Sequence, residues 1–404
     1  MRTKADPSLI RSINADLVLR LIRDVGPISR AEVARRSRLS EPTVSDLVGS
    51  LIHHGLIREV GAGLSTGGRR PTLLRFVPDA ALAVGVDLDG HGVHAGLVDL
   101  AGGIIREARL PIRSGQVGDI TRTIASTVRR VMTRSVSDRV KGVGIAVPGV
   151  VQPASRTISF APSLGWENVD LTDPLKAATG LAVCIENRAN AAALGEFWRG
   201  AGEGWRDLVF VTVRVGIGAG IILGGKLYRG VSGAAGEIGY MAVDRTALAR
   251  RPDDFGALEA VASSRAMVER MCRAMSPQEG TRLRGGRKLT PAAILRAAEA
   301  GDRTAARVIR ETVQAMGMAV ANLAAVLNPD LVVIGGSLTE RGGRMLEEIR
   351  AILMRLVPVP PQVIPSALGG QAVLLGGAAQ VFTELHGLGP HFPSRLEMVG
   401  GGRE

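Results

Sequence analysis

Two adjacent arginines on a glycine-rich backbone, in the segment Gly67-Gly-Arg-Arg-Pro71, are the first residues whose chemistry points to a ligand. Paired guanidinium groups on so slim a backbone can enter a narrow, A·T-rich minor groove of DNA. We therefore predict that Arg69 and Arg70 contact DNA. The alternative is that they belong to a solvated linker behind a small helical protein-interaction module.

The residues before these arginines have the pattern of a winged helix-turn-helix. Ser29 and Glu32 have the spacing of a capping box, which begins a short helix. Ser40 can cap the next helix, with Pro42 in the first turn, where its missing N–H costs nothing. An amphipathic helix precedes this pair, and a hairpin around the glycine-rich segment follows it as a wing.

In a helix-turn-helix the second helix of the pair enters a major groove with its first turn foremost. We predict that four residues face the bases: Pro42, Thr43, Ser45 and Asp46. Three others would meet phosphates: Ser29, Arg30 and Ser40. The acidic side chains of this helix lower non-specific affinity for a polyanion, although a carboxylate can accept a hydrogen bond from cytosine N4.

Positive charge is concentrated in the same part of the chain. Residues 1–78 hold 13 Lys and Arg against 7 Asp and Glu, which gives half of the net charge of +12 carried by 404 residues. A DNA-binding domain over residues 1–78 is therefore predicted. An α/β body over 79–385 and a disordered tail over 386–404 are predicted to follow it.

The body alternates short apolar runs with helical patterns, which indicates a mixed, largely buried sheet with helices on its faces. The predicted strands are 83–88, 94–100, 142–147, 181–186, 208–213 and 331–335. The predicted helices are 120–132, 189–199, 258–273, 291–300 and 303–327.

Composition excludes several classes of protein. With 46% hydrophobic residues the chain can bury a core, and no run of about 18 uncharged apolar residues or secretion signal is present, so a soluble, cytoplasmic protein is expected. Cys184 and Cys272 are too few for a disulfide framework or a thiolate metal site, and are expected to pack as small apolar residues.

Segments spread over most of the chain resemble the transcriptional regulators of the ROK family (repressors, open reading frames and sugar kinases). They include Ile28-Ser-Arg-Ala-Glu-Val-Ala34, Gly67-Gly-Arg-Arg-Pro71, Glu186-Asn-Arg-Ala-Asn190, Gly233-Ala-Ala-Gly-Glu-Ile-Gly239 and Asn328-Pro-Asp-Leu-Val-Val-Ile-Gly-Gly336. The resemblance covers about residues 8–383. It implies a two-lobed actin-like ATPase fold. Kinase members of the family bind a sugar and a nucleotide between the lobes, and regulator members form dimers or tetramers.

The kinase chemistry implied by this resemblance is incomplete here. Similar kinases take their catalytic base from the Asp of an Asn-Asp-Ala-Asn segment, whereas this chain has Arg188 at that position. Because a guanidinium has no acceptor and stays protonated, Arg188 cannot remove a proton from a sugar hydroxyl. We predict that the chain is not an enzyme.

The nucleotide loops implied by the resemblance are also altered. The first loop has Asp89 where the kinases have a glycine, after Asp87 and before Gly90, so a carboxylate would repel phosphate. The second loop lacks the threonine of the kinases, although its glycines remain. The glycines of the later loops are equally explained by tight turns: Gly216, Gly218, Gly220, Gly335 and Gly336.

Zinc-bearing relatives use a histidine and three cysteines, but this chain has Tyr240 at the first position and no Cys or His from 244 to 258. No structural metal and no cofactor are therefore predicted. The positions that match sugar ligands of the family are Ser163, Asn187, Arg188, Glu237, Tyr240 and Glu259. Three of the six differ from the family pattern, namely Ser163, Arg188 and Tyr240.

Two carboxylates and an amide could still bind vicinal hydroxyls, with a sugar, sugar acid or sugar phosphate as effector. Arg188 could instead pair internally with Glu237 or Glu259, leaving nothing bound. We interpret the chain as a DNA-binding regulator, and more specifically as a repressor of carbohydrate-related genes that acts as a homodimer or homotetramer on a DNA operator. The alternatives are a sugar kinase with a DNA-binding head, and a constitutive DNA-binding protein with a vestigial body.

Overall fold

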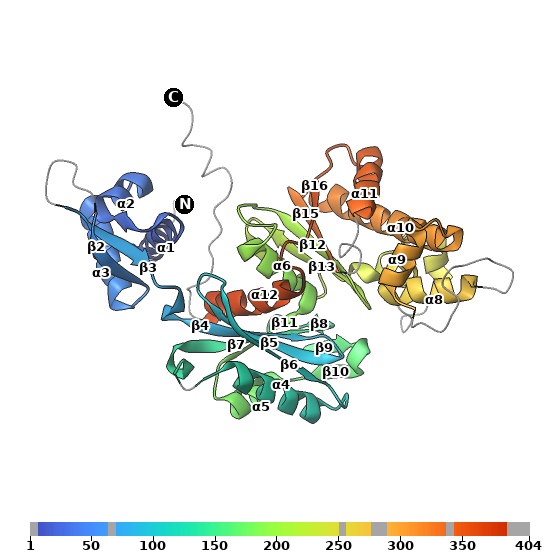
Figure 1. Cartoon of the computed structure of the whole chain (residues 1–404), viewed down its shortest axis with the longest axis horizontal. Helices are drawn as coiled ribbons and strands as arrows, with labels where there is room; N and C mark the ends of the chain where they lie inside the picture. Colours follow the sequence, from blue (N-terminus) through green and yellow to red (C-terminus); the bar gives the residue numbers. More distant parts are fainter. Residues whose placement is uncertain are drawn as a thin grey trace. The chain divides into compact units, whose positions relative to one another are not determined.

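The computed structural model describes residues 7–63, 70–133, 135–249, 256–275, 289–336 and 343–385 (Figure 1). The chain divides into two compact units. The first comprises Met1–Ala83, Leu97–Arg106 and Met132–Lys141, and the second comprises Val84–Gly96, Glu107–Val131 and Gly142–Glu404. Arg69 and the predicted tail lie outside the described residues.

The first unit begins with a winged helix-turn-helix head, blue in Figure 1. Its elements are α1 (Pro7–Val25), β1 (Ile28–Ser29), α2 (Arg30–Ser37), α3 (Glu41–His53), β2 (Ile57–Ala62) and β3 (Thr72–Phe76). The strands form an antiparallel sheet in the order β1-β3-β2. Apolar residues spaced three or four apart on the helices meet this sheet in a closed core, whose fully buried members include Val18, Ile22, Val33, Val44, Val48 and Leu74.

Two serines begin the paired helices, as the sequence predicts. The Oγ atom of Ser29 accepts from the N–H of Glu32 at 3.2 Å, and that of Ser40 accepts from the N–H of Thr43 at 3.3 Å. Only half of the predicted capping box forms among the described hydrogen bonds. The Glu32 carboxylate accepts from Arg35 and Arg36 instead, because charged donors one turn away bind it more strongly than a backbone N–H.

The rest of the chain contains two five-stranded sheets, in the orders β11-β7-β4-β5-β6 and β14-β13-β12-β15-β16, and a small sheet in the order β10-β9-β8. The strands are β4 (Leu82–Leu88), β5 (Gly92–Asp99), β6 (Ile104–Pro111), β7 (Val140–Val147), β8 (Val150–Val151), β9 (Ile158–Ala161), β10 (Trp166–Val169), β11 (Val183–Asn187), β12 (Leu208–Val213), β13 (Ile217–Leu223), β14 (Lys226–Tyr228), β15 (Leu331–Gly336) and β16 (Gln362–Pro365). Parallel pairs such as β11 with β7 and β12 with β15 are buried on both faces, which explains their continuous apolar runs.

The helices of this part are α4 (Val117–Val131), α5 (Thr172–Thr179), α6 (Arg188–Arg199), α7 (Glu259–Ala262), α8 (Ser264–Ala274), α9 (Pro291–Glu299), α10 (Arg303–Leu327), α11 (Gly343–Leu356) and α12 (Ala372–Gln380). Short 3-10 turns include η3 (Pro162–Leu164) and η4 (Ile238–Tyr240). The last element among the described residues is the helical turn η7 (Val381–Leu385). No helix among these residues is long and apolar enough to cross a membrane.

Helices α6 and α12 pack against each other at backbone distance. A Cβ atom added at Gly376 of α12 would lie 1.6 Å from the carbonyl oxygen of Ala191, and one added at Gly195 of α6 would lie 2.0 Å from that of Ala372. Side chains at these two glycines would therefore force the helices apart. This close packing holds α6, at whose start Asn187 and Arg188 of the candidate site lie.

Two predictions about the body are wrong. The helix predicted over 258–273 is broken at Ser263, whose extended backbone and side-chain bond to the N–H of Ala266 start α8 anew. Cys272 is exposed on α8 rather than packed, whereas Cys184 is buried, and burial raises the pKa of its thiol to about 11.

Candidate functional site

The head presents its predicted base-facing residues on the first turns of α3. Pro42, Ser45 and Asp46 are exposed, while the hydroxyl of Thr43 lies 2.8 Å from that of Ser40. Ser40 caps the N-terminal end of α3, and the positive end of the helix dipole there favours anions. This surface is available to a ligand without rearrangement of the head.

Of the three residues predicted beside phosphates, Ser40 caps α3, and Ser29 and Arg30 have different partners. Ser29 caps α2, whereas Arg30 donates from Nη2 to Oε1 of Glu59 on β2 at 2.8 Å. Both side chains of this ion pair are partly exposed, so Arg30 can exchange Glu59 for a phosphate at modest cost. Arg70 is exposed.

In the body, Arg188 is paired with Asp87. The guanidinium donates from Nε to Oδ1 of Asp87 at 2.5 Å and from Nη2 to Oδ2 at 2.9 Å. The partners come from the first turn of α6 and the end of β4. The predicted partners Glu237 and Glu259 are therefore wrong, because a carboxylate that meets both N–H groups of the guanidinium already lies opposite it.

This ion pair is largely buried, with side-chain exposures of 18% for Arg188 and 11% for Asp87. Burial opposes the charge of Arg188, but the attraction of Asp87, its hydrogen bonds and the nearby Asp89 outweigh it and raise the pKa of the guanidinium. Arg188 is thus held charged and occupied. It can serve neither as a proton acceptor nor, without breaking this pair, as a binding group for an anion.

The first nucleotide loop is closed on itself by Asp89. Its Oδ1 accepts from the N–H of His91 at 2.9 Å and from that of Gly92 at 2.8 Å, and the turn places Gly90 at a positive φ of 83°. The carboxylate thus occupies the backbone donors of the turn, in addition to repelling phosphate. A phosphate would have to displace a charged side chain to reach them.

The second loop is occupied in the same way. The N–H of Ile217, between Gly216 and Gly218, donates to Oε1 of Glu259 at 2.8 Å. The remaining glycines have packing roles: Gly220 lies against α6, Gly335 against Phe210, and Gly336 at a positive φ against Val213. These roles account for the glycines without a nucleotide.

Glu237, Glu259 and Asn187 lie together near the start of α6. Nδ2 of Asn187 donates to the carbonyl of Gly149 at 2.8 Å and to Oε1 of Glu237 at 3.4 Å. Burial, and then the charge of Glu259, raise the pKa of Glu237 to about 7. Burial also raises the pKa of Glu259, against the backbone hydrogen bonds that lower it.

Tyr240 ends the turn η4 and is 47% exposed. Burial of part of the ring and the charges of Glu259 and Glu237 raise the pKa of its hydroxyl. Ser163 is exposed on η3, and no described hydrogen bond links it to the other five predicted positions. The structure therefore brings Asn187, Glu237, Glu259 and Tyr240 close to one another.

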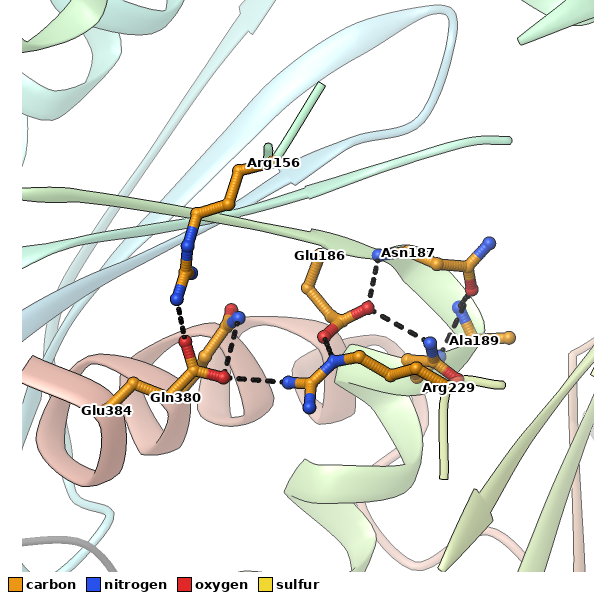
Figure 2. A network of polar contacts seen from close by, with 8 residues as sticks. Arg156, Glu186, Asn187, Ala189, Arg229, Gln380 and Glu384 are labelled. Atoms are coloured by element: carbon orange, nitrogen blue, oxygen red, sulfur yellow. Dashed lines mark hydrogen bonds and ion pairs between the residues drawn. The ribbon is translucent and has the colours of Figure 1, made fainter. Parts of the chain in front are cut away.

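An ionic network around the buried Glu186 fixes the turn before α6 (Figure 2). Glu186, at the end of β11, accepts from the N–H of Asn187 at 2.9 Å and from Nε of Arg229 at 2.7 Å. Arg229 and Arg156 both reach Glu384 of η7 at 2.7 Å. Arg229 follows β14 and so joins the second five-stranded sheet to the first, beside Asn187.

Sequence reasoning missed this network. Arg229 and Glu384 are 155 residues apart, and neither belongs to a segment with a recognisable motif. Glu186 directly precedes the Asn-Arg-Ala-Asn segment in the sequence. Only the fold shows that this residue is 3% exposed, so that its carboxylate needs a charged partner. Among the described residues, no group of three or more His, Cys, Asp or Glu side chains has the arrangement to hold a metal ion.

Comparison with known proteins covers nearly the whole chain. The profile of the ROK family matches residues 83–384. A protein of Caldicellulosiruptor bescii named "Xylose repressor" is 32% identical over 388 residues, which span 94% of this chain and 97% of that protein.

Solved structures agree with this. The crystal structure of a ROK family transcriptional regulator, a homologue of the Escherichia coli MLC protein, has a TM-score of 0.79 at 25% identity and covers 91% of this chain and 95% of that chain. A ROK family glucokinase from Streptomyces griseus, in complex with glucose and AMPPNP, has a TM-score of 0.61 at 32% identity and covers 74% of this chain and 98% of that chain. The body thus has the two-lobed, actin-like fold of these proteins, and the chain belongs to the ROK family.

Proposed function

We propose that this chain is a DNA-binding transcriptional repressor of carbohydrate-related genes, whose kinase-like body binds a sugar without phosphorylating it. The observation that carries this is the bidentate ion pair of Arg188 with Asp87, which places a bound guanidinium where a kinase needs a free carboxylate. The winged head supplies the means to read DNA. The xylose repressor relative, aligned over head and body alike, supports the same function.

The effector is a neutral sugar. Arg188 is engaged by Asp87, so the site has no spare cation among its described residues for a sugar acid or a sugar phosphate. Glu237, Glu259 and Asn187 offer acceptors that suit vicinal hydroxyl groups, and two carboxylates repel an anion. Of the three predicted effector classes, the geometry therefore favours the uncharged one.

Sugar binding to the body would change the DNA affinity of the heads through the oligomer. We place the boundary between head and body near residue 78, and two copies of the chain would set their α3 helices on successive major-groove faces of an operator. A sugar that binds one arrangement of the body better than another shifts the population of DNA-binding dimers.

A thermal-shift series tests the effector class. Xylose and glucose, gluconate and glucose 6-phosphate are added separately at millimolar concentration, and we expect a rise in melting temperature with a neutral sugar only. A ligand that binds only the folded state at 100 times its Kd adds about 2.7 kcal/mol. A Glu237→Gln/Glu259→Gln variant is expected to lose the shift. If only gluconate or glucose 6-phosphate raises the melting temperature, the assignment of a neutral effector is wrong. If none of the four does, a constitutive DNA-binding protein is favoured.

The arginine arm gives a second prediction. Replacing Arg69 and Arg70 by alanine removes two cationic contacts to DNA, so the slope of log affinity against log salt is expected to fall by about 2. Fluorescence anisotropy with promoter fragments at several salt concentrations measures this slope. A slope identical to that of the unmodified chain would remove the minor-groove contact from the proposal.

A further inference from the structure

The outer face of the wing carries two arginines directly opposite each other. In the antiparallel pair of β2 and β3, Arg58 is the register partner of Arg75, and both side chains are exposed. Opposed residues of neighbouring strands point to the same face with their Cβ atoms about 5 Å apart. The two guanidinium groups therefore start from adjacent points on one surface.

The neighbouring residues show which face this is. The flanking register pairs are Ile57 with Phe76 and Glu59 with Leu74. Ile57 is 1% exposed and Leu74 is fully buried, so these two side chains point into the core of the head, whereas Glu59 is exposed and binds Arg30. Because side chains alternate along a strand, Arg58 and Arg75 point away from that core.

Arg30, Arg35 and Arg36 of the head are neutralised by carboxylates, whereas Arg58 and Arg75 are not. Glu59 binds Arg30, and Glu32 binds Arg35 and Arg36. Within the residues that the structure describes, no carboxylate makes an ion pair with Arg58 or Arg75. Like charges directly opposite on a sheet destabilise it, so this arrangement costs stability in the free protein.

We propose that Arg58 and Arg75 form a phosphate-binding clamp on the wing, which holds the sugar-phosphate backbone of duplex DNA. Two planar guanidinium groups side by side can each give parallel N–H bonds to a phosphate oxygen pair, and the anion removes the repulsion between them. The clamp positions the head on the duplex and carries no base specificity. This inference rests on the proposed DNA-binding function and adds residues to it.

The test compares the full chain with Arg58→Ala/Arg75→Ala, and with Arg296→Ala/Arg310→Ala as a control of equal charge change on exposed positions of α9 and α10. Anisotropy is measured with a promoter fragment and with an unrelated duplex of the same length. We expect the clamp variant to lose about 2 from its salt slope on both duplexes, and roughly 10- to 100-fold in affinity at 0.1 M salt. The control should bind like the unmodified chain.

A thermal melt distinguishes the loss of phosphate contacts from misfolding of the variant. Removing the opposed charges should leave the melting temperature of the clamp variant unchanged or raised, and Arg58→Lys/Arg75→Lys should keep most of the salt slope. Equal slopes for the clamp variant and the unmodified chain would overturn the clamp while leaving DNA binding intact. Equal losses in the clamp and control variants would also overturn it. Failure of the unmodified chain to bind either duplex would instead refute the proposed function.

Discussion

Replacing Arg188 by alanine is expected to lower the free energy of unfolding by about 3–5 kcal/mol, because it leaves Asp87 charged and buried without a partner. Asp87 is 8% exposed, and the bidentate bonds from Arg188 are its described side-chain contacts. Urea unfolding followed by circular dichroism measures this loss. Replacing Arg122, whose ion pair with Asp119 on α4 is exposed, should cost less than about 1 kcal/mol.

The double variant Asp87→Leu/Arg188→Met sharpens this test. Exchanging a buried ion pair for apolar side chains of similar volume is often neutral or stabilising by about 1–4 kcal/mol. We therefore expect the double variant to be more stable than Arg188→Ala. If Arg188→Ala costs no more than Arg122→Ala, the guanidinium is not a structural partner of Asp87, and its assignment as an occupied group is wrong.

The unfolding free energy is also expected to fall as pH rises from about 4.5 to about 7, by up to about 3 kcal/mol from Glu237 alone. Burial, and the charge of Glu259, raise the pKa of Glu237 to about 7 from its ordinary value of 4.5 in the unfolded chain. In this pH window the folded protein binds more protons than the unfolded chain, so stability is greatest below 4.5 and is lost on the way to 7.

Glu237→Gln is expected to remove this loss and to be more stable than the unmodified chain at pH 8. Urea unfolding at half-unit steps of pH measures both effects. Glu347→Gln, at an exposed position of α11, serves as the control and should keep the unmodified slope. Because the pKa of Glu259 is raised as well, part of the slope is expected to remain, but a slope in Glu237→Gln as steep as that of the unmodified chain would show that Glu237 is not responsible.

The sequence predicted the head well because local rules govern it. Ser29 and Ser40 act as caps within four residues of their partners, and the apolar spacing of α3 fixes its buried face. The long helix α10 and strand β15 followed from periodicity and length in the same way. Elements such as α12 were missed because its residues are small and buried all round, which gives no period to detect.

The site could be predicted only in its residue types. The absence of a catalytic base follows from the identity of Arg188, whereas the partner of this side chain lies 101 residues away and is set by packing of α6 beside β4. The sequence predicts only that Asp89 repels phosphate. Its hydrogen bonds from the N–H groups of His91 and Gly92, which close the first loop, depend on the shape of the turn. The network of Glu186, Arg229 and Glu384 had no sequence signal.

These contacts describe a kinase-like fold in which charged side chains of the chain itself occupy the positions of the catalytic base and of the nucleotide loops. Arg188 with Asp87 takes the place of the base, and Asp89 and Glu259 occupy backbone donors of the two nucleotide loops. Restoring a carboxylate with Arg188→Asp would set it against Asp87 and Asp89, so this change alone is not expected to produce kinase activity.

One paired measurement tests the central claim most directly. The purified full chain is titrated into fluorescent fragments of its own promoter region at 0.1 M salt, with and without xylose, and the same preparation is assayed for sugar-dependent ADP release from Mg-ATP. We predict specific DNA binding that the sugar weakens, with no ADP released above the rate without sugar. Sugar-dependent ADP release by a chain that does not bind these fragments would contradict the account.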